Sequence, residues 1–274
     1  MQTRFRRHIA LPQDHGSWVF LFSPLLIGLF AGKTFTSASL ALVLAALAAF
    51  LLRQPMTIAL KAYTGRRPRS ELPAASFWIF IYGFIVCISI SSLMYQGYPM
   101  ILLLGLPAVP VFAWHLWLVS RREERRQAAI EILATGVLAL AAPAAFWIGE
   151  NAYHPLGWVL WILTWFQSAA SIIYAYLRLE QRDWQTPRSL VERYRAGTRA
   201  LTFAACASLL TLLLAALALV SPWVILPALI QLAETLWGTI FPATGLKPTA
   251  IGARQLAVST LFTLSFILAW KTIH

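Results

Sequence analysis

The sequence predicts an all-helical membrane protein, a bundle of nine transmembrane helices whose N-terminus is cytoplasmic. Hydrophobic residues make up 59% of the 274 residues, and they gather in segments close to the roughly 20 apolar residues needed to cross a hydrocarbon core. A helix satisfies its own backbone polar groups in that environment. A third observation is that basic residues fall in every second connection between these segments, as in a chain that crosses a membrane repeatedly.

Each expected span is an apolar segment, and Trp and Tyr cluster near the span ends as interfacial anchors. The first segment contains Pro24 and is followed almost at once by a second. We therefore expect it to be retained rather than removed as a signal peptide. In chain order the expected spans are 16–32, 36–52, 73–95, 99–119, 127–148, 155–177, 199–220, 222–242 and 251–270.

The connections differ in length between the two sides of the expected bundle. Those on the outer side are short, at 32–35, 96–98, 149–154 and around Ser221. The expected cytoplasmic loops are 53–72, 120–127, 178–198 and 243–251, after a basic N-terminal segment at 1–15. Because loops longer than the geometric minimum often carry function, the cytoplasmic face is the expected working face of a single domain, 1–274.

Basic residues give the expected orientation. All but two of the 22 Lys and Arg residues fall in or beside the N-terminal segment and the longer loops, and the exceptions are Lys33 and Lys271. The positive-inside rule places those loops in the cytoplasm, so we expect a multi-pass protein of the cell inner (plasma) membrane. The net charge of +12 is thereby explained by membrane topology, and no nucleic acid is expected as a partner.

Polar side chains at two span ends form the first candidate site. Arg53, Thr57 and Lys61 recur every four residues after the second span, and Tyr174, Arg178 and Arg182 recur at the same spacing after the sixth, so each set shares one helical face. If the two ends meet, they form a basic mouth for an anionic lipid-like ligand, because guanidinium groups make forked contacts with phosphate or carboxylate. The alternative is that these side chains only reach lipid phosphates. The full set of candidate ligand-binding residues is Arg53, Gln54, Thr57, Lys61, Arg66, Arg67, Tyr174, Arg178, Glu180 and Arg182.

Two carboxylates inside expected spans form the second candidate site. Glu234 lies near the middle of the eighth span, and Glu131 lies about one turn inside the fifth. A lone carboxylate in hydrocarbon is costly, so each is expected to face the bundle interior with a partner or to be protonated. Glu234 is then a proton relay or substrate contact, or half of a buried pair with an Arg of a neighbouring helix. For Glu131 we favour the structural pair, with Arg126, Arg53 or Arg178 as the partner.

The N-terminal motif resembles a known family. Residues 11–18 (LPQDHGSW), followed by Pro24 and Gly28, are similar to the start of the YwiC-like integral membrane proteins. The Arg53-Gln54-Pro55 step, the 174–182 stretch and the general layout look like that family over nearly the whole chain. This resemblance implies a membrane protein and no particular activity.

A more distant resemblance implies a mechanism. Residues 16–18 and Pro24 are similar to the first helix of UbiA-type intramembrane prenyltransferases, whose fold has nine helices, a cytoplasmic N-terminus and Asp-rich motifs that hold Mg²⁺ at the second and sixth helix ends. The motif positions fall here on Arg53, Gln54, Thr57, Lys61, Ser171, Arg178 and Glu180. Only Glu180 is acidic. Mg²⁺ needs anionic oxygen ligands, so its binding is doubtful, no cofactor is expected, and catalysis is left open.

Three functions follow from these observations. The first is a UbiA-like bundle that binds an isoprenoid or other amphiphile with an anionic head group at its cytoplasmic mouth, as a degenerate prenyltransferase or as a binder. The second is a small-solute or proton-coupled transporter built around Glu234 and spans interrupted by proline. The third is a structural or assembly subunit with a partner in a membrane complex.

Overall fold

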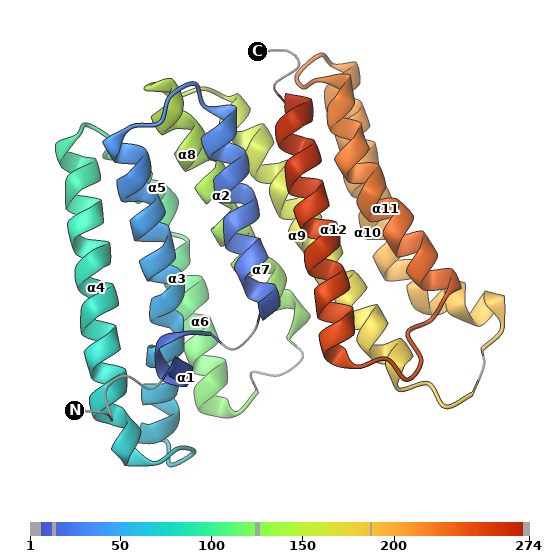
Figure 1. Cartoon of the computed structure of the whole chain (residues 1–274), viewed down its shortest axis with the longest axis horizontal. Helices are drawn as coiled ribbons and strands as arrows, with labels where there is room; N and C mark the ends of the chain where they lie inside the picture. The colour runs from blue at the N-terminus through green and yellow to red at the C-terminus, as the bar shows by residue number, and fades with distance from the viewer. Residues whose placement is uncertain (1–6, 13–14, 124–126, 187, 271–274) are drawn as a thin grey trace.

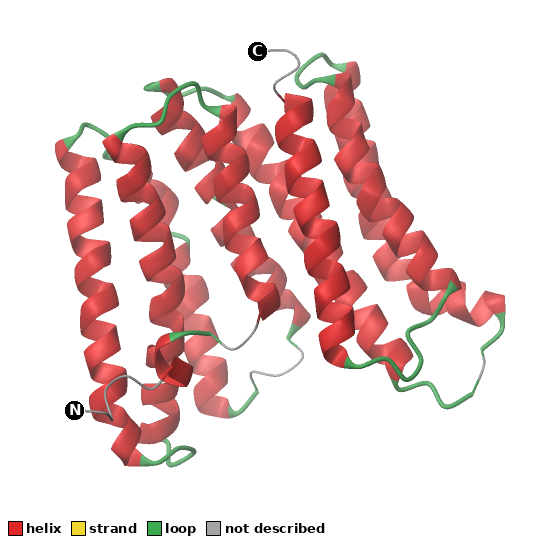
Figure 2. Ribbon diagram, viewed as in Figure 1, coloured by secondary structure: helices red, strands yellow, loops and turns green. Residues whose placement is uncertain are grey.

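The computed structural model describes residues 7–12, 15–123, 127–186 and 188–270 of the chain, which form helices joined by short connections (Figure 1, Figure 2). These described ranges contain no strand, so the predicted all-helical fold is confirmed. The helices, with three 3₁₀ helices labelled η, are α1 (Arg7–Ala10), η1 (His15–Trp18), α2 (Val19–Ala31), α3 (Ser37–Tyr63), η2 (Arg69–Glu71), α4 (Leu72–Tyr95), α5 (Met100–Gly105), α6 (Ala108–Arg121), α7 (Ala128–Ala139), α8 (Ala141–Glu150), α9 (Leu156–Arg182), α10 (Leu190–Ala216), η3 (Pro222–Val224), α11 (Ile225–Ile240) and α12 (Pro248–Trp270).

Most of these helices suit a lipid bilayer. Among the described residues, eight helical stretches are long and apolar enough to cross a membrane, and Gly16–Ala31 is a shorter apolar helix. By length and composition, the chain is a multi-pass membrane protein in a lipid environment. A ninth span, which the shorter helix would supply, stays a prediction.

Several helices extend beyond the expected spans, because hydropathy marks the part in lipid and not the end of the helix. The helix α3 begins at a capping box formed by Thr36 and Ser39, and it continues through Pro55 to Tyr63. The helix α10 begins at a second capping box, where Ser189 and Glu192 bond reciprocally. Such caps supply partners for the first free N–H groups of a helix, so both helices reach into the charged loops.

Two expected spans are each divided into a pair of helices. The span expected at 99–119 consists of α5 and α6, and Pro107 stands at the break. The span expected at 127–148 consists of α7 and α8, which meet at Leu140, and Pro143 lies in the first turn of α8. Proline is tolerated in the first turn of a helix but removes a hydrogen bond from its interior, which accounts for where the new helices begin.

The helices form a row of three groups (Figure 1). The helices α3, α4 and α6 pack together on one flank, α2, α7 and α8 occupy the middle, and α9 joins them to α10, α11 and α12 on the other flank. Two apolar core clusters hold the middle group to its neighbours. A side chain at Gly28 would overlap the backbone of Ala142, so glycine permits the close contact of α2 with α8.

The connections lie alternately at the two ends of the bundle. Those after α3, α6, α9 and α11 lie at the end where the chain begins, and those after α2, α4, α8 and α10 lie at the opposite end, where α12 ends (Figure 1). The longer basic loops therefore share one end, called here the basic end. Its assignment to the cytoplasm stays a prediction.

Candidate polar site between α9, α11 and α12

One face of α9 carries a line of polar side chains. Gln167, Ser171, Tyr174, Arg178 and Gln181 follow one another at spacings of four and three residues, which keeps them on one face of the helix. All five are buried. Since α9 is otherwise apolar enough to span a membrane, this face needs polar partners inside the protein.

The helix α11 supplies most of those partners. Gln231 and Thr235 are buried one turn apart, and Glu234 lies beside them. Gln167 Nε2 donates to Gln231 Oε1 at 2.9 Å, and Gln231 Nε2 donates to Thr235 Oγ1 at 3.2 Å. The α9–α11 interface thus contains a connected chain of amide and hydroxyl groups.

Glu234 joins three helices. Its Oε1 accepts from the hydroxyl of Tyr174 on α9 at 2.8 Å. Arg254 on α12 donates from Nε to Oε1 at 2.6 Å and from Nη2 to Oε2 at 2.8 Å. The Glu234 side chain is 10% exposed and the Arg254 side chain 45% exposed, so the carboxylate is largely covered and the guanidinium is accessible.

Arg254 also stacks on an aromatic ring. Its guanidinium carbon lies 3.6 Å from the ring centroid of Trp237, which belongs to α11. Cation–π contact holds an Arg at a surface that is part apolar and part wet. Glu234 and Trp237, one turn apart on α11, therefore bind the same side chain from α12.

Arg178 is engaged in a different way. Its Nη1 donates to Gln181 Oε1 at 2.9 Å, to the carbonyl of Gly238 at 2.7 Å and to that of Phe241 at 2.6 Å. Arg193 of α10 donates to the carbonyl of Ile240 at 2.9 Å. Both guanidinium groups satisfy carbonyls at the C-terminus of α11, where free acceptors and the negative end of the helix dipole favour cations.

A small cavity lies beside Glu234. Its wall contains Tyr174, Arg178, Glu234, Leu246, Ala250, Ile251, Arg254 and Gln255. Gln255 Nε2 donates to the carbonyl of Ser171 at 2.8 Å, which closes one side. This cavity combines two guanidinium groups, one carboxylate and one phenol with an apolar wall.

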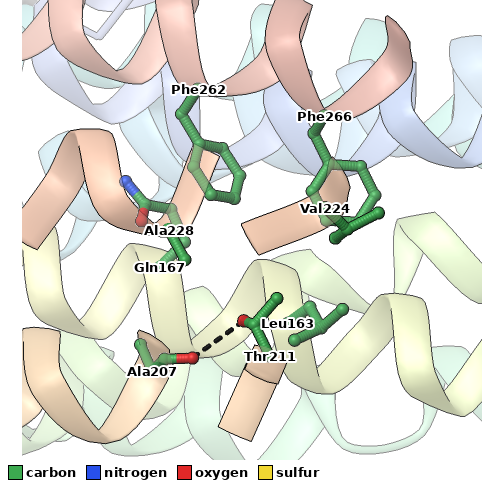
Figure 3. A pocket seen from close by; sticks show the side chains of 8 residues that line it. All are labelled: Leu163, Gln167, Ala207, Thr211, Val224, Ala228, Phe262 and Phe266. Carbon is green, nitrogen blue, oxygen red and sulfur yellow. Dashed lines mark hydrogen bonds between the residues drawn. The ribbon is translucent and has the colours of Figure 1, made fainter. Parts of the chain in front are cut away.

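A second small cavity lies further along α9. Figure 3 shows the side chains that line it, with Gln167 and Thr211 as its polar members. The remaining lining residues are Leu163, Ala207, Val224, Ala228, Phe262 and Phe266. The Thr211 hydroxyl donates to the carbonyl of Ala207 at 2.8 Å. Gln167 lines this cavity and binds Gln231, so the amide pair lies between the second cavity and Glu234.

The predicted residues at the end of α3 lie in a different group. Gln54 Nε2 donates to the carbonyl of His8 at 3.0 Å, Arg66 Nη1 donates to that of Val119 at 2.6 Å, and Arg67 pairs with Glu71 at 3.0 Å. These contacts join α3 and its following loop to α1, α6 and η2.

The predicted meeting of Arg53 and Arg178 stays a prediction. The Arg53 guanidinium lies 5.5 Å from the ring centroid of Phe50, while Arg178 is bound within α9 and α11. Thr57 and Lys61 follow Arg53 on α3, which packs mainly on α4. The helix α9 packs on α7, α8 and α10 to α12, and α2 and α8 pack on both α3 and α9. The structure instead brings Tyr174 and Arg178 together with Glu234, which the sequence placed in a separate candidate site.

The other predicted residues lie outside this cluster. Glu180 is exposed, and Arg182 Nε donates to Asp183 Oδ1 at 2.9 Å. Glu131 accepts from the hydroxyl of Tyr176 at 2.8 Å. Arg126, one of the partners expected for Glu131, lies outside the described residues.

Sequence reasoning missed Arg254 and Trp237. Arg254 falls inside the expected span 251–270, and an Arg inside a span requires a partner, as Glu234 does. The two opposite charges, which lie in consecutive expected spans, were a usable signal. The stacking of Trp237 had no comparable signal, because aromatic residues near span ends are ordinary interfacial anchors.

Comparisons with known proteins concern mainly the other half of the chain. Residues 11–146 match the model of the family described as YwiC-like protein. The uncharacterized protein YwiC of Bacillus subtilis (strain 168) is 26% identical over 154 residues, which are 56% of this chain and 59% of that protein. The chain thus spans less than two thirds of this curated relative. No solved structure gives a significant match, and the UbiA resemblance stays a prediction.

Proposed function

We propose that this chain, which residues 11–146 place in the YwiC-like family, is a proton-coupled membrane carrier for a small solute. The observation that carries this proposal is Glu234, a carboxylate in an apolar helix that binds Tyr174 on α9 and Arg254 on α12. An ionisable residue in a membrane span commonly belongs to an ion or substrate pathway. The site lies outside the matched range, so the carrier function is proposed for this chain alone.

The proton-linked step would be the breaking of one ion pair. An ionised Glu234 holds Arg254 through two hydrogen bonds and so ties α12 to α11. A protonated Glu234 would lose the charge that attracts the guanidinium. Because the Arg254 side chain is 45% exposed, it has room to leave. Protonation would thereby loosen contact between two helices, as alternating access requires.

The polar α9–α11 interface would supply the pathway. One small cavity lies beside Glu234, and a second contains Gln167 and Thr211. The Gln167–Gln231 hydrogen bond lies between them, at a position where separating two side chains would connect the cavities. Amides suit this role because each can form hydrogen bonds with water or a polar solute as readily as with the other amide.

Cysteine accessibility tests the pathway without knowledge of the solute. The natural Cys87 and Cys206 are exposed and are first replaced by Ser. Thr211→Cys is then treated, in membrane vesicles of either orientation, with a small water-soluble methanethiosulfonate. We expect reaction from the end opposite the basic end, and slower reaction when Glu234→Gln is added.

The matched control is Ala145→Cys, which places a thiol at an equally buried position in the core of the middle group. A carrier exposes position 211 and leaves position 145 protected. Equal protection of both thiols from both sides, with and without a proton gradient, would overturn the carrier. Indifference of the chain to every polar substitution, with co-purification of a larger membrane complex, would then favour an assembly subunit.

A second candidate is a binder of an amphiphile with an anionic head group. It is supported by the basic end, where Arg178 and Arg254 line a cavity and where Arg53, Lys61 and Arg66 lie on or just after α3. We propose no Mg²⁺ at such a site, because Arg53, Lys61 and Arg178 would repel it. Labelled prenyl diphosphate tests it: unchanged binding in Arg53→Ala with Arg178→Ala, or no binding by the parent protein, would overturn it.

A further inference from the structure

We infer that the solute of this site is an oxyanion, which replaces the Glu234 carboxylate on Arg254 while Glu234 takes up one proton. The inference rests on the proposed carrier and specifies its substrate class and its coupling. The ligand chemistry is a carboxylate, sulfonate or phosphate group. Its source is either a free anion or the head group of an anionic lipid.

The geometry of Arg254 supports this replacement of the Glu234 carboxylate by an oxyanion. Nε and Nη2 form one edge of the guanidinium, and each donates to a different oxygen of Glu234, at 2.6 Å and 2.8 Å. Any oxyanion with two oxygens on one face can accept the same pair of bonds. Arg254 is the accessible member of the pair and Glu234 the largely covered one, so an arriving anion can reach the guanidinium.

The charges around Glu234 determine what accompanies the anion. From α9 the carboxylate faces Tyr174 and Arg178, and from α12 it faces Arg254. Lys247 precedes α12, and Arg193 of α10 binds the end of α11. Arg178, Arg254 and ionised Glu234 together carry one positive charge. Binding one monoanion and one proton leaves that charge unchanged, whereas binding the anion alone removes it.

Electroneutral exchange is favoured because the site has low polarity. A displaced Glu234 carboxylate, 10% exposed, would keep the Tyr174 hydroxyl and lose the guanidinium that donates to both of its oxygens, while Arg178 stays bound to carbonyls of α11. Uncompensated buried charge is costly, and a buried carboxylate without a cation becomes protonated instead. The proton comes from water, Arg254 remains charged, and no covalent bond other than the O–H bond of Glu234 is formed.

The test uses methanesulfonate, a monoanion whose charge does not change between acidic and neutral pH. Binding to the full chain in maltoside micelles is measured by calorimetry, and proton uptake is measured with a pH indicator in weak buffer. We expect one proton taken up per methanesulfonate bound. The affinity should rise as the pH falls, by up to about tenfold per pH unit where free Glu234 is ionised.

Variants separate the two roles. Glu234→Gln should still bind methanesulfonate, because the amide leaves Arg254 free, but proton uptake and the pH dependence should disappear. Arg254→Gln should lose binding. The matched control is Lys33→Gln, which removes a cation from the Lys33–Glu150 ion pair at the opposite end of the bundle and should change neither quantity. Binding by the parent protein without proton uptake, undiminished binding by Arg254→Gln, or no binding by the parent would each overturn the inference.

Nanodiscs distinguish the two sources. If phosphatidylglycerol added to phosphatidylcholine discs weakens methanesulfonate binding by the parent protein, a lipid head group occupies Arg254; if it has no effect, the ligand is a free anion. Both results support the oxyanion. A reactive Thr211→Cys without proton uptake leaves the carrier in place and removes this coupling. Proton uptake with a protected Thr211→Cys leaves anion binding and removes transport.

Discussion

Glu234 and Arg254 meet edge to edge, with Arg254 Nε 2.6 Å from Oε1 and Nη2 2.8 Å from Oε2 of the carboxylate. The two residues lie on neighbouring helices, α11 and α12, and only Arg254 is widely accessible. This asymmetry means that loss of each partner has a different effect.

Loss of Arg254 should cost more stability than loss of Glu234. Arg254→Gln leaves a carboxylate that is 10% exposed without its cation, whereas Glu234→Gln leaves an accessible guanidinium that water or lipid phosphate can bind. Unpaired buried charges are destabilising, so we expect a loss of about 2 kcal/mol for Arg254→Gln and about half of that for Glu234→Gln. Thermal unfolding in detergent measures both, and an inverted order would contradict the asymmetric burial.

Gly238 should tolerate no side chain. An added Cβ would overlap the ring and hydroxyl of Tyr174, so Gly238→Ala should displace the phenol from Glu234. We expect a loss of roughly 1–3 kcal/mol in unfolding free energy, as for overpacked cores. Gly83→Ala is the control: space around Gly83 is open within α4, and alanine there should be neutral or slightly stabilising. Equal effects of the two variants would refute the predicted steric clash.

Arg178 should be irreplaceable by Lys. Its Nη1 serves three acceptors near the end of α11, and a flexible ammonium group lacks the planar geometry for this set. Arg178→Lys and Arg178→Gln should both lose on the order of 3 kcal/mol, as when a buried charged network is broken. Proteolysis of the 241–247 connection, together with the melting temperature, reports the loss of the hydrogen bonds from Arg178 to the end of α11. Full stability of Arg178→Lys would show that charge alone suffices.

The buried amides should matter more for transport than for stability. Gln167→Leu with Gln231→Leu removes the hydrogen bond between them, and such bonds in membrane proteins contribute only about 0.6 kcal/mol on average. Proton-coupled uptake of methanesulfonate into proteoliposomes, followed with internal pyranine, should nevertheless be abolished. Ser23→Ala with Thr263→Val removes a comparable bond between α2 and α12 and should preserve uptake. If both double variants transport equally well, the amides only hold the helices together.

The basic end should face the cytoplasm. Thr64 is exposed in the connection after α3, and Ala152 is exposed at the opposite end. In the background without Cys87 and Cys206, an impermeant maleimide added to whole cells should label Ala152→Cys and spare Thr64→Cys. The reverse pattern would invert the orientation given by the positive-inside rule.

Several parts of the fold could be predicted from particular residues. Apolar segments located most of the helices, and the basic residues indicated which connections share one end. Helix ends could not be predicted as well, because the Thr36 and Ser189 caps carry α3 and α10 past the limits of hydropathy. The breaks at Pro107 and Leu140 depend on local backbone geometry that a hydropathy pattern does not contain.

The candidate site was predicted less completely. Periodicity correctly placed Tyr174 and Arg178 on one helical face, and the requirement for a partner singled out Glu234. The sequence did not show which helix supplies the partner of Glu234. Arg254 is that partner because α12 packs on α11. Arg178 donates to carbonyls near the end of α11, and its predicted mouth with Arg53 stays a prediction.

By itself, the sequence determined that this chain is a helical membrane protein with one basic end, because hydrophobicity and charge act on each segment separately. Only the tertiary structure decided which buried polar groups bind one another. Apolar helices can pack in many arrangements with similar burial, and the pairing of residues as distant as Tyr174 and Glu234 depends on which arrangement leaves the fewest polar groups unsatisfied.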